Sequence, residues 1–172
     1  MKNVIIILLS LVLAVVSSIS VLAQEKKSLP DLFFVGTTFR TTGAPSFSGE
    51  NIVVPIEMRI QNSKFGGAAG PFQLSIMWQY PPPAAPMETE LEFTGTRTFT
   101  GLEPGRAVTV RGQVIFPKSQ AGHKVKIRAI VDSMSQVSES IETNNASSWL
   151  EVQLPPLEIR KPPVEIKPKG AK

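Results

Sequence analysis

The chain has 172 residues, a length that suits one globular domain. It contains no cysteine and a single histidine, which excludes disulfides, thiolate metal sites and cysteine nucleophiles. The formal net charge of +4 arises mainly after residue 157, where basic side chains outnumber acidic ones. The rest of the chain is close to neutral, so nucleic acid is not an expected partner.

The first 23 residues have the pattern of a secretory signal peptide. A short basic start at 1–3 is followed by an apolar run at 4–16, and Val21-Leu22-Ala23 offers small residues for cleavage. We therefore expect an exported protein that is periplasmic, on the cell surface or secreted, with no transmembrane anchor after cleavage. An uncleaved N-terminal anchor is the alternative.

After a polar leader at 24–28, the chain shows a series of short strand patterns and no helical period. Four stretches alternate between apolar and polar side chains, as strands with one buried face do. They are 51–61, 72–80, 106–116 and 123–132. Shorter strands are expected at 30–35, 91–99 and 147–154, with loops at 37–50 and 62–71. The pattern predicts an Ig-like antiparallel β-sandwich of about seven strands.

The most diagnostic segment follows the last of the long strands. Residues 131–145 read VDSMSQVSESIETNN, and three shorter signatures precede them: Pro30-Asp31-Leu32, Asn62 and Leu102-x-Pro104-Gly105. This order resembles the CARDB domain, an Ig-like, adhesion-related module of bacteria and archaea. The resemblance covers 29–154 and implies the same fold and, loosely, an adhesive role. A polyproline insert at 81–86 departs from the family pattern.

The acidic loop after residue 131 has two interpretations. Its hard oxygen donors favour a calcium site, since Ca²⁺ takes six to eight oxygen ligands. The proposed ligands are Asp132, Glu139, Glu142, Asn144 and Asn145. The alternative is structural, because Asp and Asn side chains also cap backbone N–H groups and shape turns. The loop lacks a D-x-D-x-D spacing and a glycine pivot, so calcium is a possible cofactor and none is required.

Aromatic side chains are a second group of candidates, because exposed rings stack on sugars. Trp78 and Tyr80 lie on the apolar face of a strand and are expected in the core, whereas the orientation of Trp149 is left open by the sequence. Phe33, Phe34 and Phe39 give the first strand an apolar edge, which is either packed or open to a partner strand.

The C-terminal segment 155–172 is rich in proline and basic residues. It contains a short repeat, PPLEIRK followed by PPVEIKP, and is expected to be extended and disordered. It is a spacer, a docking peptide, or an electrostatic contact to an anionic envelope polymer. The partner-binding residues would then be Arg160, Lys161, Lys167 and Lys169.

Catalytic chemistry has few residues to use. His123 is the only histidine and begins a strand, while Glu139 and Glu142 lie too close together in one loop to flank a cleft. We therefore predict no enzyme. The expected function is an exported, non-catalytic binding or adhesion module that contacts an envelope or secreted protein or a surface polysaccharide. The alternatives are a carbohydrate-binding accessory module and a periplasmic assembly or chaperone-like factor that uses an open sheet edge and the tail.

Overall fold

The computed structural model describes residues 28–81 and 88–157. The predicted signal peptide, most of the polyproline insert and the tail after residue 157 lie outside this part of the chain. The described residues contain no helix that is long and apolar enough to cross a membrane.

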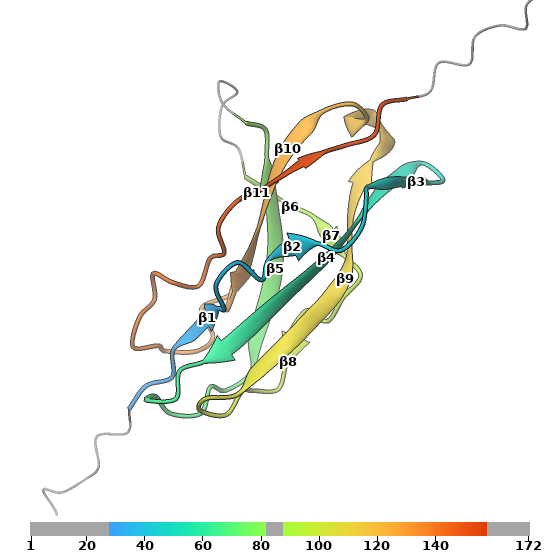
Figure 1. The fold of residues 1–172 in the computed structure, drawn as a ribbon. Helices are drawn as coiled ribbons and strands as arrows, with labels where there is room; N and C mark the ends of the chain where they lie inside the picture. The colour runs from blue at the N-terminus through green and yellow to red at the C-terminus, as the bar shows by residue number, and fades with distance from the viewer. Residues whose placement is uncertain (1–27, 82–87, 158–172) are drawn as a thin grey trace, which may run out of the picture.

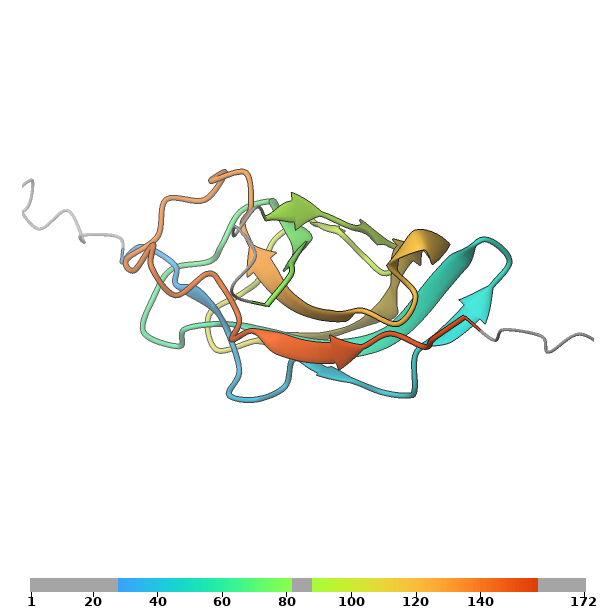
Figure 2. The same ribbon diagram turned by 90° about the horizontal axis from the view of Figure 1, so that it is seen from above.

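Two sheets pack face to face, and every strand pairing is antiparallel (Figures 1 and 2). The first sheet has the order β1 (Leu32–Phe34), β4 (Asn51–Asn62), β9 (Ala107–Pro117) and β7 (Glu92–Phe93), with β2 (Arg40–Thr41) and β3 (Ser46–Ser48) also paired to β4. The second has the order β11 (Leu150–Gln153), β10 (Lys124–Val131), β5 (Phe72–Gln79) and β6 (Thr89–Glu90), with β8 (Thr98–Phe99) also on β5. The fold is the expected Ig-like antiparallel β-sandwich.

The core lies between the two sheets and follows from the period-two pattern. In β4 every second side chain is buried, and β10 repeats this alternation from the opposite sheet. The buried side chains of these two strands are Ile52, Val54, Ile56, Met58, Ile60, Val125, Ile127, Ala129 and Val131. Trp78 of β5 meets Phe116 of β9 edge to face, with 5.5 Å between the ring centroids, and so joins the sheets.

Pro55 interrupts the strand pairing on one side of β4, because a proline has no N–H to donate to a neighbouring strand. Arg40 of β2 pairs with Glu57, whereas Ser46 of β3 pairs with Val53, so the register changes across the intervening loop. Pro55 lies opposite this loop, and neither β2 nor β3 pairs with β4 at that residue. The missing N–H of the proline therefore breaks no regular hydrogen bond between strands. The expected loop at 37–50 thus contains two short strands, which are formed by long-range pairing with β4.

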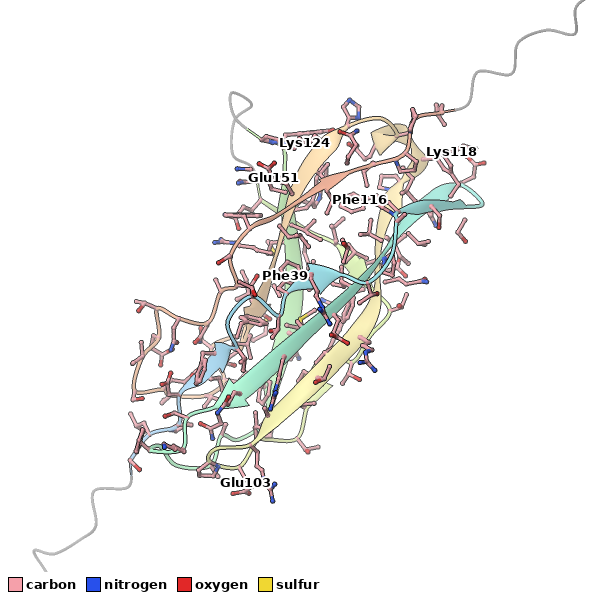
Figure 3. All side chains as sticks on the ribbon, in the orientation of Figure 1. Phe39, Glu103, Phe116, Lys118, Lys124 and Glu151 are labelled. Carbon is pink, nitrogen blue, oxygen red and sulfur yellow. The ribbon has the colours of Figure 1, made fainter. Side chains whose placement is uncertain are left out.

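The sandwich has two distinct ends, and Figure 3 shows Glu103 at one and Lys118 at the other. We call the first the loop end; it is formed by 28–31, 62–71, 100–106 and 132–149. The opposite end, here the tail end, contains the 3₁₀ turn Lys118–Gln120 and residues 154–157. The described chain therefore enters at one end and leaves at the other.

Asn62, the last residue of β4, is fully buried and fastens three segments of the loop end. Its Oδ1 accepts a hydrogen bond from the backbone N–H of Asp31 at 3.1 Å. Its Nδ2 donates to the carbonyls of Gly67 at 2.9 Å and Leu102 at 2.8 Å. All three partners are backbone groups in segments outside the regular strands. One buried side chain thus supplies the hydrogen bonds that strand pairing would otherwise provide.

Replacement of Asn62 by alanine should lower the free energy of unfolding by about 3 kcal/mol, since it leaves buried backbone groups without partners. The matched control is Asn51→Ala, an exposed asparagine at the other end of the same strand, which should cost less than about 0.5 kcal/mol. Urea unfolding of both variants measures the difference. Equal losses in the two variants would contradict the role assigned to Asn62.

Candidate functional site

Asp132 ends β10 and turns the chain into the acidic loop. It adopts a left-handed backbone conformation with φ of 48°, which aspartate tolerates better than most residues. Its side chain is buried, and its two oxygens accept hydrogen bonds from the backbone N–H groups of Gln136 at 2.9 Å and Val137 at 3.0 Å. The Asp132 side chain therefore caps the first turn of the acidic loop.

Glu139 links the acidic loop to strand β1. Its carboxylate is buried and accepts hydrogen bonds from the backbone N–H of Leu32 and from Nδ2 of Asn145, the latter at 2.8 Å. The next residue, Ser140, donates its N–H to the carbonyl of Pro30 at 2.8 Å. The acidic loop and the start of β1 are thus held together at two successive residues.

The remaining three residues of the predicted ligand set also take part in this network. Glu142 accepts a hydrogen bond from the N–H of Glu139 at 2.8 Å, and Asn144 donates to the carboxylate of Asp31 at 2.7 Å. The amide oxygens of Asn144 and Asn145 are buried and have no hydrogen-bond partner among the described residues. The hydrogen bonding of the loop is incomplete at these two atoms.

Burial raises the pKa of Glu139 above the ordinary value of a glutamate. The negative charges of Glu142 and Asp132 raise this pKa further, while the hydrogen bonds from Leu32 and Asn145 lower it. The folded state therefore holds the Glu139 proton more tightly than the unfolded state does. As the pH rises through the range between the ordinary and the raised pKa, the glutamate makes the fold less stable.

The structure brings the five predicted calcium ligands into one loop but directs most of their oxygens to other groups. Both oxygens of Asp132 and both of Glu139 accept N–H hydrogen bonds. In the described part of the chain, no group of three or more acidic or histidine side chains is arranged to hold a metal ion. The geometry favours the structural interpretation, and the calcium site stays a prediction.

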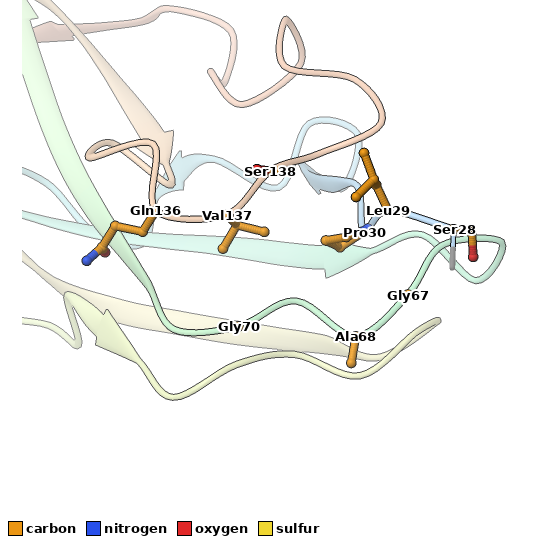
Figure 4. Close-up of a pocket in the computed structure, with 9 residues that line it drawn as sticks. All are labelled: Ser28, Leu29, Pro30, Gly67, Ala68, Gly70, Gln136, Val137 and Ser138. Carbon is orange, nitrogen blue, oxygen red and sulfur yellow. The ribbon is translucent and has the colours of Figure 1, made fainter. Parts of the chain in front are cut away.

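A pocket of about 300 Å³ opens beside this network (Figure 4). It is lined by residues of three segments of the chain, 28–30, 67–70 and 136–138. Glycine is required on one wall, because a Cβ on Gly67 would lie 2.4 Å from the carbonyl oxygen of Ser28. Gly70 differs, since a Cβ there would meet no atom within 4 Å. The pocket is therefore a preformed concave surface between fastened loops.

Four large apolar side chains are exposed at this end, one of them Met134 of the acidic loop. We call the other three the apolar tip: Phe65, Leu29 and Ile141. The exposed fraction is 80% for Phe65 and 48% for each of the other two. Leu29 and Phe65 are not among the residues predicted from the sequence, and Ile141 is exposed although the sequence pattern of the acidic loop predicts an inward position for it and for Val137. The available signal was their setting, since each is a large apolar residue inside a polar or glycine-rich loop with no strand period around it.

The aromatic candidates for sugar stacking are already in contact with protein groups. Trp149 is half-buried, and the guanidinium carbon of Arg128 lies 4.7 Å from its ring centroid. Arg128 in turn pairs with Glu88 at 2.6 Å. Tyr80 packs against Trp78 and donates its hydroxyl hydrogen to Gln120. These contacts occupy surfaces that a sugar ring would need.

His123 lies at the tail end, far from the acidic loop along β10. Its ring meets Tyr80 edge to face, with 5.7 Å between centroids, and its Nδ1 lies 3.2 Å from the carbonyl oxygen of Gln120. These contacts suit a packed turn residue. The basic candidates Arg160, Lys161, Lys167 and Lys169 lie outside the described residues.

Two substitutions of Glu139 distinguish the contribution of its hydrogen bonds to stability from the contribution of its charge. Glu139→Ala should lower the free energy of unfolding by about 2 kcal/mol, because the Leu32 N–H loses its buried acceptor. Glu139→Gln keeps an acceptor for Leu32 and, after rotation of the Asn145 amide, a partner for its own NH₂ group. The glutamine variant should therefore gain stability relative to wild type as the pH rises from 4.5 toward 7. Urea unfolding across this range tests both, and a pH-independent difference between glutamate and glutamine would contradict the effect of burial.

Calcium should change the stability very little, because a cation must displace existing hydrogen bonds to reach Asp132 and Glu139. With 10 mM CaCl₂, a site with a dissociation constant of ~1 mM would add about 1.4 kcal/mol, or roughly 5 °C in melting temperature. We expect a shift below about 1 °C, measured by differential scanning fluorimetry against MgCl₂ as the ionic control. A calcium-specific rise of several degrees would establish the site.

Comparison with known proteins agrees with the resemblance seen in the sequence. A family model described as CARDB matches residues 86–149. No curated protein sequence matches the chain. Among solved structures, β-glucosidase 3B from Thermotoga neapolitana in complex with glucose is 16% identical with a TM-score of 0.46, covering 73% of this chain and 16% of the enzyme. The chain thus spans only about a sixth of that enzyme.

Two further similar structures are of one CARDB domain from Pyrococcus furiosus. The crystal structure, a complex with di-metal ions, is 19% identical with a TM-score of 0.44, covering 76% of this chain and 97% of that domain. The solution structure is 19% identical with a TM-score of 0.43. The family match supports an adhesion-related or binding kind of module. Residues 86–149 match the CARDB family model, and the resemblance predicted from the sequence is confirmed.

Proposed function

We propose that this chain is an exported, non-catalytic binding module of the bacterial envelope or exterior, which contacts a protein or a surface polymer through the loop end. The observation that carries the proposal is the fastening of the loops. Asn62, Asp132 and Glu139 are buried polar residues whose side chains bond backbone groups of the loop end. A surface held in one conformation loses little entropy on binding, which favours recognition.

The distribution of chemical groups supports binding over catalysis. The Glu142 carboxylate accepts a hydrogen bond from the backbone N–H of Glu139, and the Glu139 carboxylate accepts hydrogen bonds from Leu32 and Asn145. The histidine packs at the opposite end of the domain. Catalysis needs a nucleophile or a base within reach of an orienting partner. The loop end instead presents a preformed pocket and exposed apolar side chains, which are features of a recognition surface.

The basic tail adds a second, electrostatic contact to this proposal. The described chain leaves the domain at the tail end, so the tail begins at the opposite end of the domain from the loop end. Its excess of lysine and arginine fits an anionic envelope polymer. The contact through the tail should fade with salt, whereas the contact through the pocket should persist.

Co-sedimentation of residues 24–172 with envelope fragments of the source cell tests the proposal. Gly70→Arg places a long side chain across the pocket at a position with open space, so the fold should be retained. We expect binding at least tenfold weaker. Ser48→Arg adds the same charge at the exposed tail-end strand β3 and should bind like wild type. Wild-type binding by Gly70→Arg would remove the loop end from the proposal.

A tail variant distinguishes the two contacts. Replacement of Arg160, Lys161, Lys167 and Lys169 by glutamine should abolish only the part of envelope binding that 0.5 M salt also removes. Loss of all binding in this variant would place the whole contact in the tail.

A further inference from the structure

The apolar tip is a compact feature, because its three residues belong to segments that are tied together. Ile141 follows Ser140, whose N–H donates to the Pro30 carbonyl at 2.8 Å, and Pro30 follows Leu29. Phe65 precedes Gly66, which approaches Leu29 so closely that a Cβ on it would lie 2.5 Å from the Leu29 carbonyl oxygen. The three exposed side chains are therefore held on neighbouring loops of one fixed surface.

A cationic group accompanies the apolar side chains. The ammonium nitrogen of Lys64 lies 4.8 Å from the ring centroid of Phe65. The sequence also places Lys26 and Lys27 shortly before Leu29. An aromatic ring with a lysine beside it combines an apolar body with a group that binds phosphate, the combination found at membrane interfaces.

The size of the apolar tip decides between two classes of partner. A stable protein interface buries about 800 Å² on each side, over 20 or more residues. The three side chains of the apolar tip supply far less apolar area than this. Insertion into a lipid headgroup layer has no such requirement, because its strength grows with each apolar side chain and each nearby cation.

The path of the chain places the same end near a membrane. The apolar run at 4–16 ends twelve residues before Ser28, where the domain begins at the loop end. Twelve residues span at most about 40 Å when extended. While the run is held by a membrane, as in the anchor considered above, Ser28 lies within about 40 Å of the bilayer, and the loop end carries the point of attachment.

We propose that the apolar tip is a contact site for an anionic lipid bilayer. Leu29, Phe65 and Ile141 enter the headgroup region, and Lys64 binds lipid phosphate beside Phe65. The proposal rests on the proposed module function in using the same loop end, and it adds lipid as a partner. The contact is peripheral: side chains enter the interface while both sheets stay outside.

The test uses residues 24–172, because the run at 4–16 would itself bind vesicles and both sheets lie within residues 28–157. The probes are large unilamellar vesicles of phosphatidylcholine, with or without 30 mol% phosphatidylglycerol. Phe65→Ser removes the most exposed ring of the tip. The matched control is Phe47→Ser, which alters an exposed phenylalanine of β3 at the tail end. Both side chains are solvent-accessible, and melting curves check that both variants fold.

We expect wild type to sediment with the anionic vesicles, Phe65→Ser to bind at least tenfold more weakly, and Phe47→Ser to bind like wild type. Lys64→Gln should weaken binding about fivefold, the contribution of one lysine near an anionic surface. Phe65→Trp should add a tryptophan emission component that shifts to the blue when vesicles are added, whereas the component added by Phe47→Trp should not shift.

Other outcomes overturn the proposal and identify its replacement. In the first, the wild type fails to bind vesicles but still binds envelope fragments, and protease treatment of the fragments abolishes that binding. This result would assign the apolar tip to a protein partner and would leave the proposed module function unchanged. Vesicle binding that survives Phe65→Ser and disappears with the neutralised tail assigns lipid contact to the tail. Equal losses in Phe65→Ser and Phe47→Ser show non-specific adsorption.

Discussion

The arrangement of the loop end depends on side chains that hydrogen-bond to the backbone from inside the protein. Asn62, Asp132 and Glu139 are buried, and each satisfies main-chain groups that no strand reaches. Leaving such groups unpaired would cost one to three kcal/mol apiece. Without these contacts, the positions of the loops relative to one another would not be fixed, because the loops extend from both sheets and from the start of the described chain. The pocket and the apolar tip exist because this network holds their walls in place.

The same network explains why the acidic loop resembles a metal site in sequence. Oxygen-rich side chains suit both calcium and backbone N–H groups, and the choice depends on the direction of each carboxylate. In Asp132 both oxygens face N–H groups of its own loop, and in Glu139 they face β1 and Asn145. That direction is set by packing between segments distant in sequence, so composition alone leaves both interpretations open.

Much of the sandwich follows from local patterns, and the exceptions have a common cause. Alternation is a property of neighbouring residues, so it locates β4, β5, β9 and β10 closely. The short strands β2 and β3 lie in a stretch rich in glycine, serine and threonine, and form only because β4 offers an edge on either side of Pro55. The exposure of Phe65 could not be predicted for a similar reason. Exposure depends on the tertiary structure, and a single phenylalanine in a loop belongs to no periodic sequence pattern.

The opposite placement of the two ends has a mechanical consequence. A pull on the two ends is transmitted through β1, paired antiparallel with β4, and through β11, paired antiparallel with β10. Because both outer strands run along the direction of the pull, their hydrogen bonds are loaded in shear and must break together. The Asp31 and Leu32 amides, held by Asn62 and Glu139, stand where the load enters. The domain is therefore built to resist tension along its long axis.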